Sequence, residues 1–384
     1  MSKKNDSLAL LPNGFADLLP PDAEVEAVSI RTLMEKFSAF GYQRIKPPLL
    51  EFEDSLLAPG PGERLASETF RVMDPVSHRM LGIRSDITGQ ISRIVSSRLK
   101  NEPRPLRLRY ANDVLRTRGS QIRTGRQFVQ VGCELIGESG CAETDVEICV
   151  LSILGLKSLG LGNLTIDLTI PGFVSYLISD LGDEKAARVR KYVAQRDVDA
   201  LGVFDDAGVS VVAKAMAAPE DAHEALDVIL GFELNDELRA FVVRLQRVCD
   251  GIYKALSELA IDDVSVTIDL LEQNGFEYHK ALGFTLFSGD VSGEVGRGGC
   301  YDVCFGQGDD EEVAKGFTLY MDTISKGLPV LNKQDIVFVP RDIGWNTVSD
   351  LQAQGWTILR GVGDDQIPDE CTHTYKDGKI EKLS

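Results

Sequence analysis

One stretch of the chain carries side chains whose types and spacing suit the binding of an amino acid. In RQFVQVGCELIG, Gln130, Gly132 and Glu134 are two residues apart, so a β-strand presents all three on one face. Arg116 precedes them on what we expect to be the facing strand. An arginine offers a planar fork of donors to a carboxylate, and a glutamate suits an ammonium group. The pattern therefore predicts a zwitterion pocket, although the same alternation is typical of the solvent face of an antiparallel sheet.

A second stretch, IRSDITGQ, places Asp86 and Thr88 at the start of a predicted helix. Taken locally, this pattern is typical of a helix cap, in which Ser85 or Asp86 accepts hydrogen bonds from the first N–H groups. The carboxylate of Asp86 also suits an ammonium group if the helix start faces the same pocket. The residues alone favour the cap.

A third stretch, NGFEYHKALGFTLF, mixes aromatic and polar residues between two glycines. Alternation sets Phe276 and Tyr278 on one face of a strand and Glu277 and His279 on the other. A core strand does not normally turn both a glutamate and a histidine inward, so one face should be polar. His279 is then either a ligand contact or, as is commoner, an ordinary surface residue.

Charge and composition narrow the class of protein. The 384 residues include 41 lysines and arginines against 59 aspartates and glutamates, a formal net charge of −18. Nucleic-acid binding depends on cations that neutralise phosphates, so we expect no nucleic-acid partner. The basic stretch from 93 to 126 suits an anionic small ligand as well as RNA. No apolar run approaches the roughly 20 residues that span a bilayer, which predicts a cytoplasmic protein without a membrane partner.

The cysteines predict neither disulfides nor a metal site. There are seven, an odd number without a framework of spacings, so we expect free thiols. Cys300 and Cys304 lie four residues apart but no histidine or cysteine pair nearby completes a tetrahedral site. The expectation is a chain with no metal and no cofactor.

Periodicity predicts an α+β fold built on a mostly antiparallel sheet with flanking helices. Its closing strands include GRGGCYDVCF and GFTLYMDTI. Strand patterns nearly vanish between residues 173 and 258, which predicts a helical insertion. The domain boundaries that follow are 1–172 with 259–329 for the sheet domain, 173–258 for the insertion and 330–384 for a small α/β tail.

The order of these segments resembles the catalytic domain of histidyl-tRNA synthetase, a class II aminoacyl-tRNA synthetase fold, from about residue 12 to residue 325. The most specific piece is RQFVQVGCELIG; KPPLLEFED, RSDIT, NGFEYHKALGF, GRGGCYD and KGFTLYMD stand in the family's order. The resemblance implies that the matching positions hold histidine: Asp86, Thr88, Arg116, Gln130, Glu134, Tyr278 and His279. His279 replaces a tyrosine of the family, which weakens that one assignment.

The departures from the synthetase pattern remove polar and cationic groups that serve ATP. Arg118 stands where the second class II motif has a glutamate, and Asn274, Cys300 and Thr323 stand at or near family arginines. Adenylate formation develops negative charge, and one lost donor costs on the order of 3 kcal/mol of transition-state stabilisation. We therefore expect no catalytic residues in this chain.

This combination resembles the regulatory subunits of ATP phosphoribosyltransferase, synthetase-like paralogues from histidine biosynthesis. The resemblance implies a short-form catalytic subunit as partner, histidine as effector, and a dimer formed around residues 46–51. The tail after residue 330, about half an anticodon-binding domain, agrees with it. The alternative is an active histidine-tRNA ligase or another amino-acid-adenylating enzyme. A third possibility is a structural paralogue with an empty pocket.

Overall fold

The computed structural model describes residues 10–58, 62–119, 123–137, 141–219, 221–272, 279–303, 312–329, 335–363 and 366–383. The chain divides into two compact units, within each of which the residues contact one another extensively: Met1–Pro329 and Val330–Ser384. Each unit has its own sheet and its own core, and each is described by itself.

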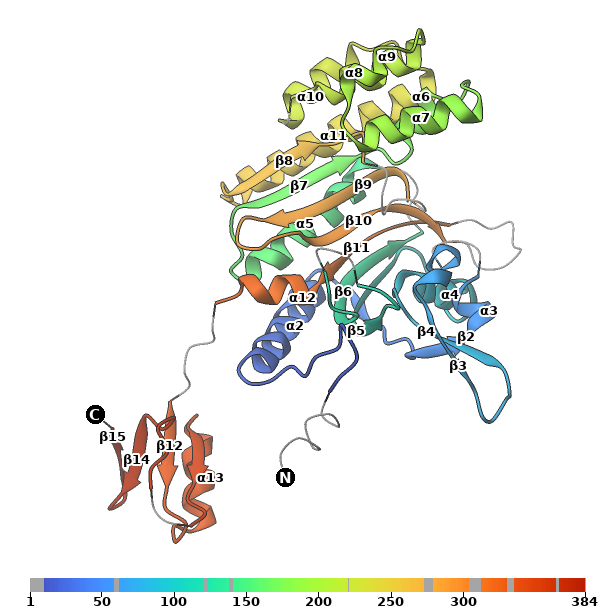
Figure 1. Cartoon of the computed structure of the whole chain (residues 1–384). Coiled ribbons are helices and arrows are strands. Elements are labelled where there is room, and N and C mark those ends of the chain that lie inside the picture. The colour runs from blue at the N-terminus through green and yellow to red at the C-terminus, as the bar shows by residue number, and fades with distance from the viewer. Residues whose placement is uncertain are drawn as a thin grey trace. The chain divides into compact units, whose positions relative to one another are not determined.

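An eight-stranded sheet runs through the larger unit (Figure 1), in the order β1-β5-β6-β11-β10-β9-β7-β8. Its central strands are antiparallel, while the pairs β1/β5 and β7/β8 at the two edges are parallel. The predicted α+β class with a mostly antiparallel sheet is confirmed. The strands are β1 (Gln43–Arg44), β5 (Leu106–Leu115), β6 (Gln127–Ile136), β7 (Leu164–Thr169), β8 (Val264–Ile268), β9 (His279–Ser288), β10 (Glu294–Val303) and β11 (Glu312–Tyr320).

One face of this sheet is covered by helices. The covering helices are α2 (Asp22–Ala39), α5 (Ala142–Ser158) and α11 (Asp236–Glu258). On β6, Val131, Cys133 and Leu135 are fully buried in the core that these helices share with the sheet. Because side chains alternate along a strand, Gln130 and Glu134 point to the opposite face, as the sequence predicts.

A three-stranded sheet and a helix lie beside β5 and β6. The sheet has the order β2 (Leu50–Phe52), β4 (Met80–Ile83), β3 (Phe70–Met73), with α3 (Glu53–Leu56), the 3-10 turn Glu63–Ser67 and α4 (Thr88–Ser97) next to it. Ile87, Ile91 and Val95 recur at helical spacing and are buried against Tyr110 of β5. This packing fixes the start of α4, and with it Asp86 and Thr88, over the open face of the large sheet.

Between residues 173 and 258, the regular elements that the structure describes are helices, joined by short turns. They are α6 (Phe173–Leu177), α7 (Asp183–Ala194), α8 (Val198–Leu201), α9 (Ala207–Met216), α10 (Ala222–Leu230) and α11. Four of these helices begin at a side chain that accepts a hydrogen bond from the next turn: Asp197, Asp206, Asp221 and Asn235. Each such cap stabilises the start of a helix by about 1 kcal/mol. Several caps along the segment therefore favour several separate helices.

The smaller unit packs one helix on a four-stranded sheet. The sheet order is β13 (Thr357–Arg360), β12 (Ile336–Val339), β14 (His373–Lys376), β15 (Lys379–Lys382), and the helix is α13 (Trp345–Ala353). Val337, Val339, Val348 and Leu351 form its buried core. In the larger unit, α12 (Met321–Ile324) and the 3-10 turn Ser325–Gly327 follow β11.

The helices of the described residues are short or amphipathic. With 23 residues, α11 is long enough to cross a bilayer, but charged residues recur along it from Asp236 to Glu258. Nowhere in the described ranges does a helix have both the length and the apolarity of a membrane span.

Candidate ligand-binding site

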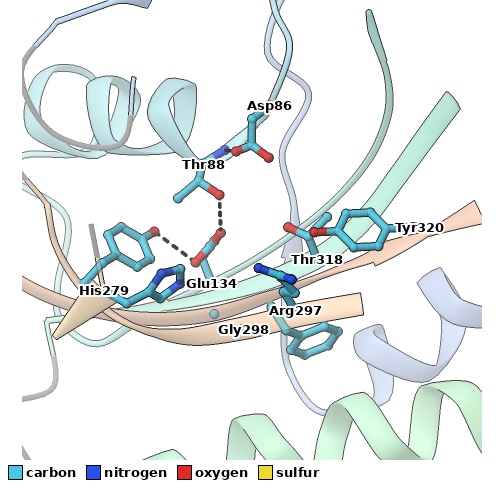
Figure 2. A pocket seen from close by; sticks show the side chains of 11 residues that line it. Asp86, Thr88, Glu134, His279, Arg297, Gly298, Thr318 and Tyr320 are labelled. Carbon is cyan, nitrogen blue, oxygen red and sulfur yellow. Dashed lines mark hydrogen bonds between the residues drawn. The ribbon is translucent and has the colours of Figure 1, made fainter. Parts of the chain in front are cut away.

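A polar cavity opens on the face of the large sheet that the helices α2, α5 and α11 leave uncovered (Figure 2). Its volume is about 50 Å³. Since roughly 10–15 Å³ admits one water, it has room for a few waters or for the polar head of an amino acid. The residues that line it are Asp86, Thr88, Glu134, His279, Arg297, Gly298, Tyr301, Gly316, Phe317, Thr318 and Tyr320.

Glu134 is a buried carboxyl group at the floor of the cavity, with 1% of its surface exposed. Its Oε2 accepts a hydrogen bond from the Tyr301 hydroxyl at 2.9 Å, and its Oε1 accepts longer ones from Tyr110 at 3.4 Å and Thr88 at 3.5 Å. Burial raises the pKa of Glu134 to about 8, the three hydroxyls oppose that shift, and Asp86 adds to it. A carboxyl group that is costly to ionise and is met only by neutral donors is suited to receive a cation.

Gly316 on β11 makes room for this carboxyl group, and Gly298 on β10 makes room for the Phe284 ring. A Cβ atom on Gly316 would lie 1.8 Å from Oε2 of Glu134, and one on Gly298 would lie 2.3 Å from the Phe284 ring. Any side chain at Gly316 would therefore displace Glu134. The glycine-rich segment thus packs closely against neighbouring backbone and side chains.

Asp86 is held by two donors at the entrance to α4. Its Oδ1 accepts a hydrogen bond from the backbone N–H of Thr88 at 2.9 Å, and its Oδ2 accepts one from Nε2 of Gln130 at 2.8 Å. Asp86 thus plays the local role at a helix start that its sequence favours, and it also lines the cavity. Gln130 is fully buried and reaches the cavity only through Asp86.

Arg297 is a cation of the cavity that the sequence analysis missed. It lies on β10, where Figure 2 shows it between Glu134 and Thr318. Glu294 forms ion pairs with both Arg297 and Arg123, which fixes the two guanidinium groups. Burial lowers the pKa of Arg297, but Glu294 outweighs that effect and leaves the pKa above its ordinary value, so the charge is permanent.

A signal for Arg297 was present in the sequence. Arg297 and Tyr301 lie four residues apart in GRGGCYD, an even spacing that puts both on one face of a regular strand. Arg297 lies three residues before Cys300, the position at which the synthetase family has its arginine.

His279 forms one wall of the cavity at the start of β9. Its ring makes an edge-to-face contact with Tyr301, with 6.5 Å between ring centroids. Burial and the charge of Arg297 lower the pKa of His279 to about 3, so the imidazole is neutral. A neutral ring beside a carboxyl group and a guanidinium group can donate or accept a hydrogen bond without adding charge.

The structure brings together some of the residues predicted to hold a ligand. Asp86, Thr88, Glu134 and His279 line the cavity, and Gln130 positions Asp86. Tyr278 lies outside the described residues, as does Asn274.

Arg116 is not among the residues that line the cavity. Strand β5 ends at Leu115, so Arg116 lies one residue past the strand on which we placed it. Its Nε is 3.5 Å from Oε2 of Glu68, and its guanidinium group lies 5.3 Å from the Phe128 ring centroid.

The fold and the site together define a protein of the class II aminoacyl-tRNA synthetase type. A family model described as histidyl-tRNA synthetase matches residues 14–324. A crystal structure from Bacillus halodurans, titled as an ATP phosphoribosyltransferase regulatory subunit/histidyl-tRNA synthetase, superposes with a TM-score of 0.78, covering 93% of this chain and 94% of that one at 21% identity. Histidyl-tRNA synthetase from Nostoc superposes with a TM-score of 0.75 over 94% and 87% of the chains at 14% identity. These likenesses confirm the predicted fold.

Curated relatives at higher identity narrow the assignment. A protein of Rhodospirillum centenum is 40% identical over 98% of this chain and 97% of its own, and one of Paramagnetospirillum magneticum is 39% identical over 97% and 98%. A protein of Gluconobacter oxydans is 36% identical over 98% of both chains. All three are named ATP phosphoribosyltransferase regulatory subunit. The chain belongs to the family of ATP phosphoribosyltransferase regulatory subunits, as its resemblance predicts.

Proposed function

We propose that this chain catalyses no reaction of its own and activates a short-form ATP phosphoribosyltransferase catalytic subunit, to which it conveys feedback by histidine. The observation that carries the proposal is the agreement of relatives at 36–40% identity over nearly the whole chain, all of which bear the regulatory-subunit name. The cytoplasm is the compartment that this role implies.

The positions at which the synthetase family places arginines support a role without adenylation. Cys300 points away from the cavity, and its Sγ donates to Oδ1 of Asp145 at 3.2 Å. Thr323 is buried inside α12. Arg297 is the one cation among the described residues that line the cavity, and Glu294 already neutralises it. One paired guanidinium suits a carboxylate better than the triphosphate of ATP, whose charge requires several cations.

The polar groups of the cavity suit the charged head of histidine, for which the cavity has room. The carboxyl groups of Asp86 and Glu134 offer acceptors for the ammonium group, and Arg297 lies across the cavity for the carboxylate.

Calorimetric titration with histidine tests the pocket. We expect saturable binding of L-histidine and none of histidinol, which lacks the carboxylate that Arg297 would hold. No heat at millimolar histidine would support the empty structural paralogue instead. ATP–pyrophosphate exchange that depends on histidine would establish the ligase alternative and overturn the proposal.

Reconstitution with a short-form catalytic subunit tests the activating role. We expect the two chains to copurify, phosphoribosyl transfer to require both, and histidine to inhibit the mixture. The isolated chain should have no phosphoribosyltransferase activity. Activity of the chain alone, or a catalytic subunit indifferent to its addition, would contradict the proposal.

We also propose that the chain forms a dimer through the three-stranded sheet β2-β4-β3 and the segment 46–51. A contiguous group of exposed apolar side chains on a protein surface usually marks an interface with another molecule. Large apolar side chains are exposed on this sheet and segment: Leu49, Leu50, Phe52, Val72, Met73 and Met80. The two-fold pairing of one patch with its own copy is the commonest oligomer. Light scattering should give the mass of a dimer, and Leu50→Glu with Met73→Glu should give that of a monomer; an unchanged mass would exclude this surface.

A further inference from the structure

A second, larger cavity lies at the other end of the large sheet, where the helical insertion meets its outer strands. Its volume is about 470 Å³, within the range of small-molecule sites. Strands β7, β8 and β9 contribute to it, together with α9, α10 and the turn after α7. The residues that line it are Thr165, Asp167, Arg196, Ala215, Met216, Ala218, Pro219, Ile229, Thr267, Ile268, Asp269, Leu270 and Phe287.

Strand register places the two cavities on one face of the sheet. Thr318 of β11 pairs with Arg297 of β10, Arg297 with Thr285 of β9, and Thr285 with Asp167 of β7. Paired residues on neighbouring strands point to the same face. With strands roughly 4.8 Å apart, Asp167 lies about 14 Å from Thr318, too far for one small ligand to fill both cavities.

Asp167 is the principal polar group of the second cavity. Its Oδ1 accepts a hydrogen bond from Oγ1 of Thr267 at 2.6 Å. Burial raises the pKa of Asp167 to about 6, Thr267 opposes that shift, and the carboxylates of Asp269 and Glu272 add to it. Arg196 lowers the pKa, but this arginine is itself paired with Asp269.

We propose that this cavity is a second binding site, which takes a small organic cation with an apolar body. The cationic group would sit against Asp167 and the hydroxyl of Thr267, and the body would pack against Met216, Ile229 and Phe287. A cation restores the charge balance that Asp167 lacks, whereas an anion would add to the repulsion. The proposal is independent of the regulatory role and of the histidine pocket.

An organic cation fits these residues better than a metal ion. Metal ions in proteins take several oxygen, nitrogen or sulfur ligands from converging side chains. In the described part of the chain, no three histidine, cysteine, aspartate or glutamate residues converge in that way. Met216, Ile229 and Phe287 give the second cavity an apolar part, which suits the body of a ligand.

Calorimetric titration of the full-length protein with tyramine tests the site. At about pH 7.5 a carboxyl group with a pKa of about 6 is ionised, so the amine should bind saturably. Its uncharged analogue 4-ethylphenol should bind at least about tenfold more weakly, since it keeps the ring and loses the cation.

Two variants locate the binding. Asp167→Asn should weaken tyramine binding about tenfold or more, and Met216→Trp should block the cavity without touching the charge. Asp180→Asn, a matched change at an exposed carboxylate of the insertion, should leave the affinity within about twofold. Thermal unfolding of each variant checks that it is folded.

Three results would overturn the proposal. They are the absence of saturable binding up to about 10 mM tyramine, equal binding of 4-ethylphenol, and wild-type affinity in both Asp167→Asn and Met216→Trp.

Discussion

Two clusters of charged residues lie on opposite faces of the large sheet at strands β10 and β11. They differ in the partners that each buried carboxylate finds within the chain. On the helix-covered face, Asp145 is fully buried and accepts hydrogen bonds from Arg244 at 2.7 and 2.9 Å, while Lys315 lies 2.9 Å away. On the open face, Glu134 is equally buried but meets only hydroxyl groups. The first carboxylate has its cationic partners within the chain, whereas no ion pair to the second is found among the described residues, although Arg297 lies in the same cavity.

Adjacent residues separate the two clusters. Lys315 belongs to the covered cluster and Gly316 to the cavity, and likewise Cys300 and Tyr301 point to opposite sides. The covered cluster joins the sheet to α11 of the insertion through Arg244, so its role is structural. The comparison indicates that a buried charge with complete partners holds a fold together, and that one with a missing partner marks a binding site.

The largest expected effect comes from breaking the covered cluster. Arg244→Met removes two hydrogen bonds of Asp145 while Lys315 still pairs with it, and we expect a loss of about 2–3 kcal/mol of unfolding free energy. Denaturant unfolding measures it. The control is Arg247→Met, at an exposed position of the same helix, which should cost less than about 0.5 kcal/mol. Equal losses of unfolding free energy in Arg244→Met and Arg247→Met would refute a structural role of the covered cluster.

A change in the open cluster should affect binding and spare stability. Glu134→Gln keeps the shape of the side chain and removes a carboxyl group that is costly to ionise. The unfolding free energy should therefore stay unchanged or rise. Histidine affinity should fall about 30-fold, since the ligand's ammonium group loses its charged partner. Glu134→Ala and Asp86→Ala should also weaken binding. The control is Glu312→Gln, which changes a partly exposed carboxylate paired with Arg104 and should leave histidine affinity, measured by calorimetry, unchanged. If Glu134→Gln or Asp86→Ala retains wild-type affinity, the residue changed in that variant does not belong to the site.

A third pair of variants decides which arginine holds the ligand's carboxylate. Arg297→Met should lower histidine affinity about tenfold, and Arg116→Met should lower it less than about threefold. The reason is position: Arg297 lines the cavity, and Arg116 lies beside Glu68. The reverse order of effects would restore the assignment that the synthetase resemblance implies.

The last prediction concerns protons. The pKa of Glu134 is raised to about 8, above its unfolded value near 4.5, so stability from this group falls as pH rises from about 4.5 to 8. Binding of the ammonium group favours the carboxylate and should release a proton below pH 8. Histidine affinity should therefore rise by up to about tenfold per pH unit toward pH 8 and then level off.

Calorimetry in two buffers of different ionisation enthalpy counts the released proton, and Glu134→Gln should abolish the release. The other groups that face Glu134 are Asp86, Tyr110, Tyr301 and Thr88, while Arg297 and His279 share the cavity. His279 has a pKa of about 3 and Arg297 stays charged, so neither titrates in this range. Proton release that persists in Glu134→Gln would contradict the assignment of the proton to Glu134.

The sequence by itself determined the fold class, the order of the elements and the polar face of β6. Alternation along RQFVQVGCELIG is a local property with a period of two, so Glu134 could be placed without knowing its neighbours. Helix caps such as Asp206 and Asn235 are equally local. Local patterns erred only at boundaries: GFTLYMDTI reads as one strand, yet β11 ends at Tyr320 and α12 begins at Met321.

Only the tertiary structure decided which charges meet. Arg297 faces Glu134, Arg116 does not reach the cavity, and Cys300 belongs to the opposite cluster. These placements depend on the pairing of strands distant in sequence: β10 pairs with β11 in unbroken register, which sets Arg297 opposite Thr318 and Cys300 opposite Lys315. A change of register by one residue would bring the two faces of these strands into the wrong combination, and the register is fixed by long-range contacts rather than by local sequence.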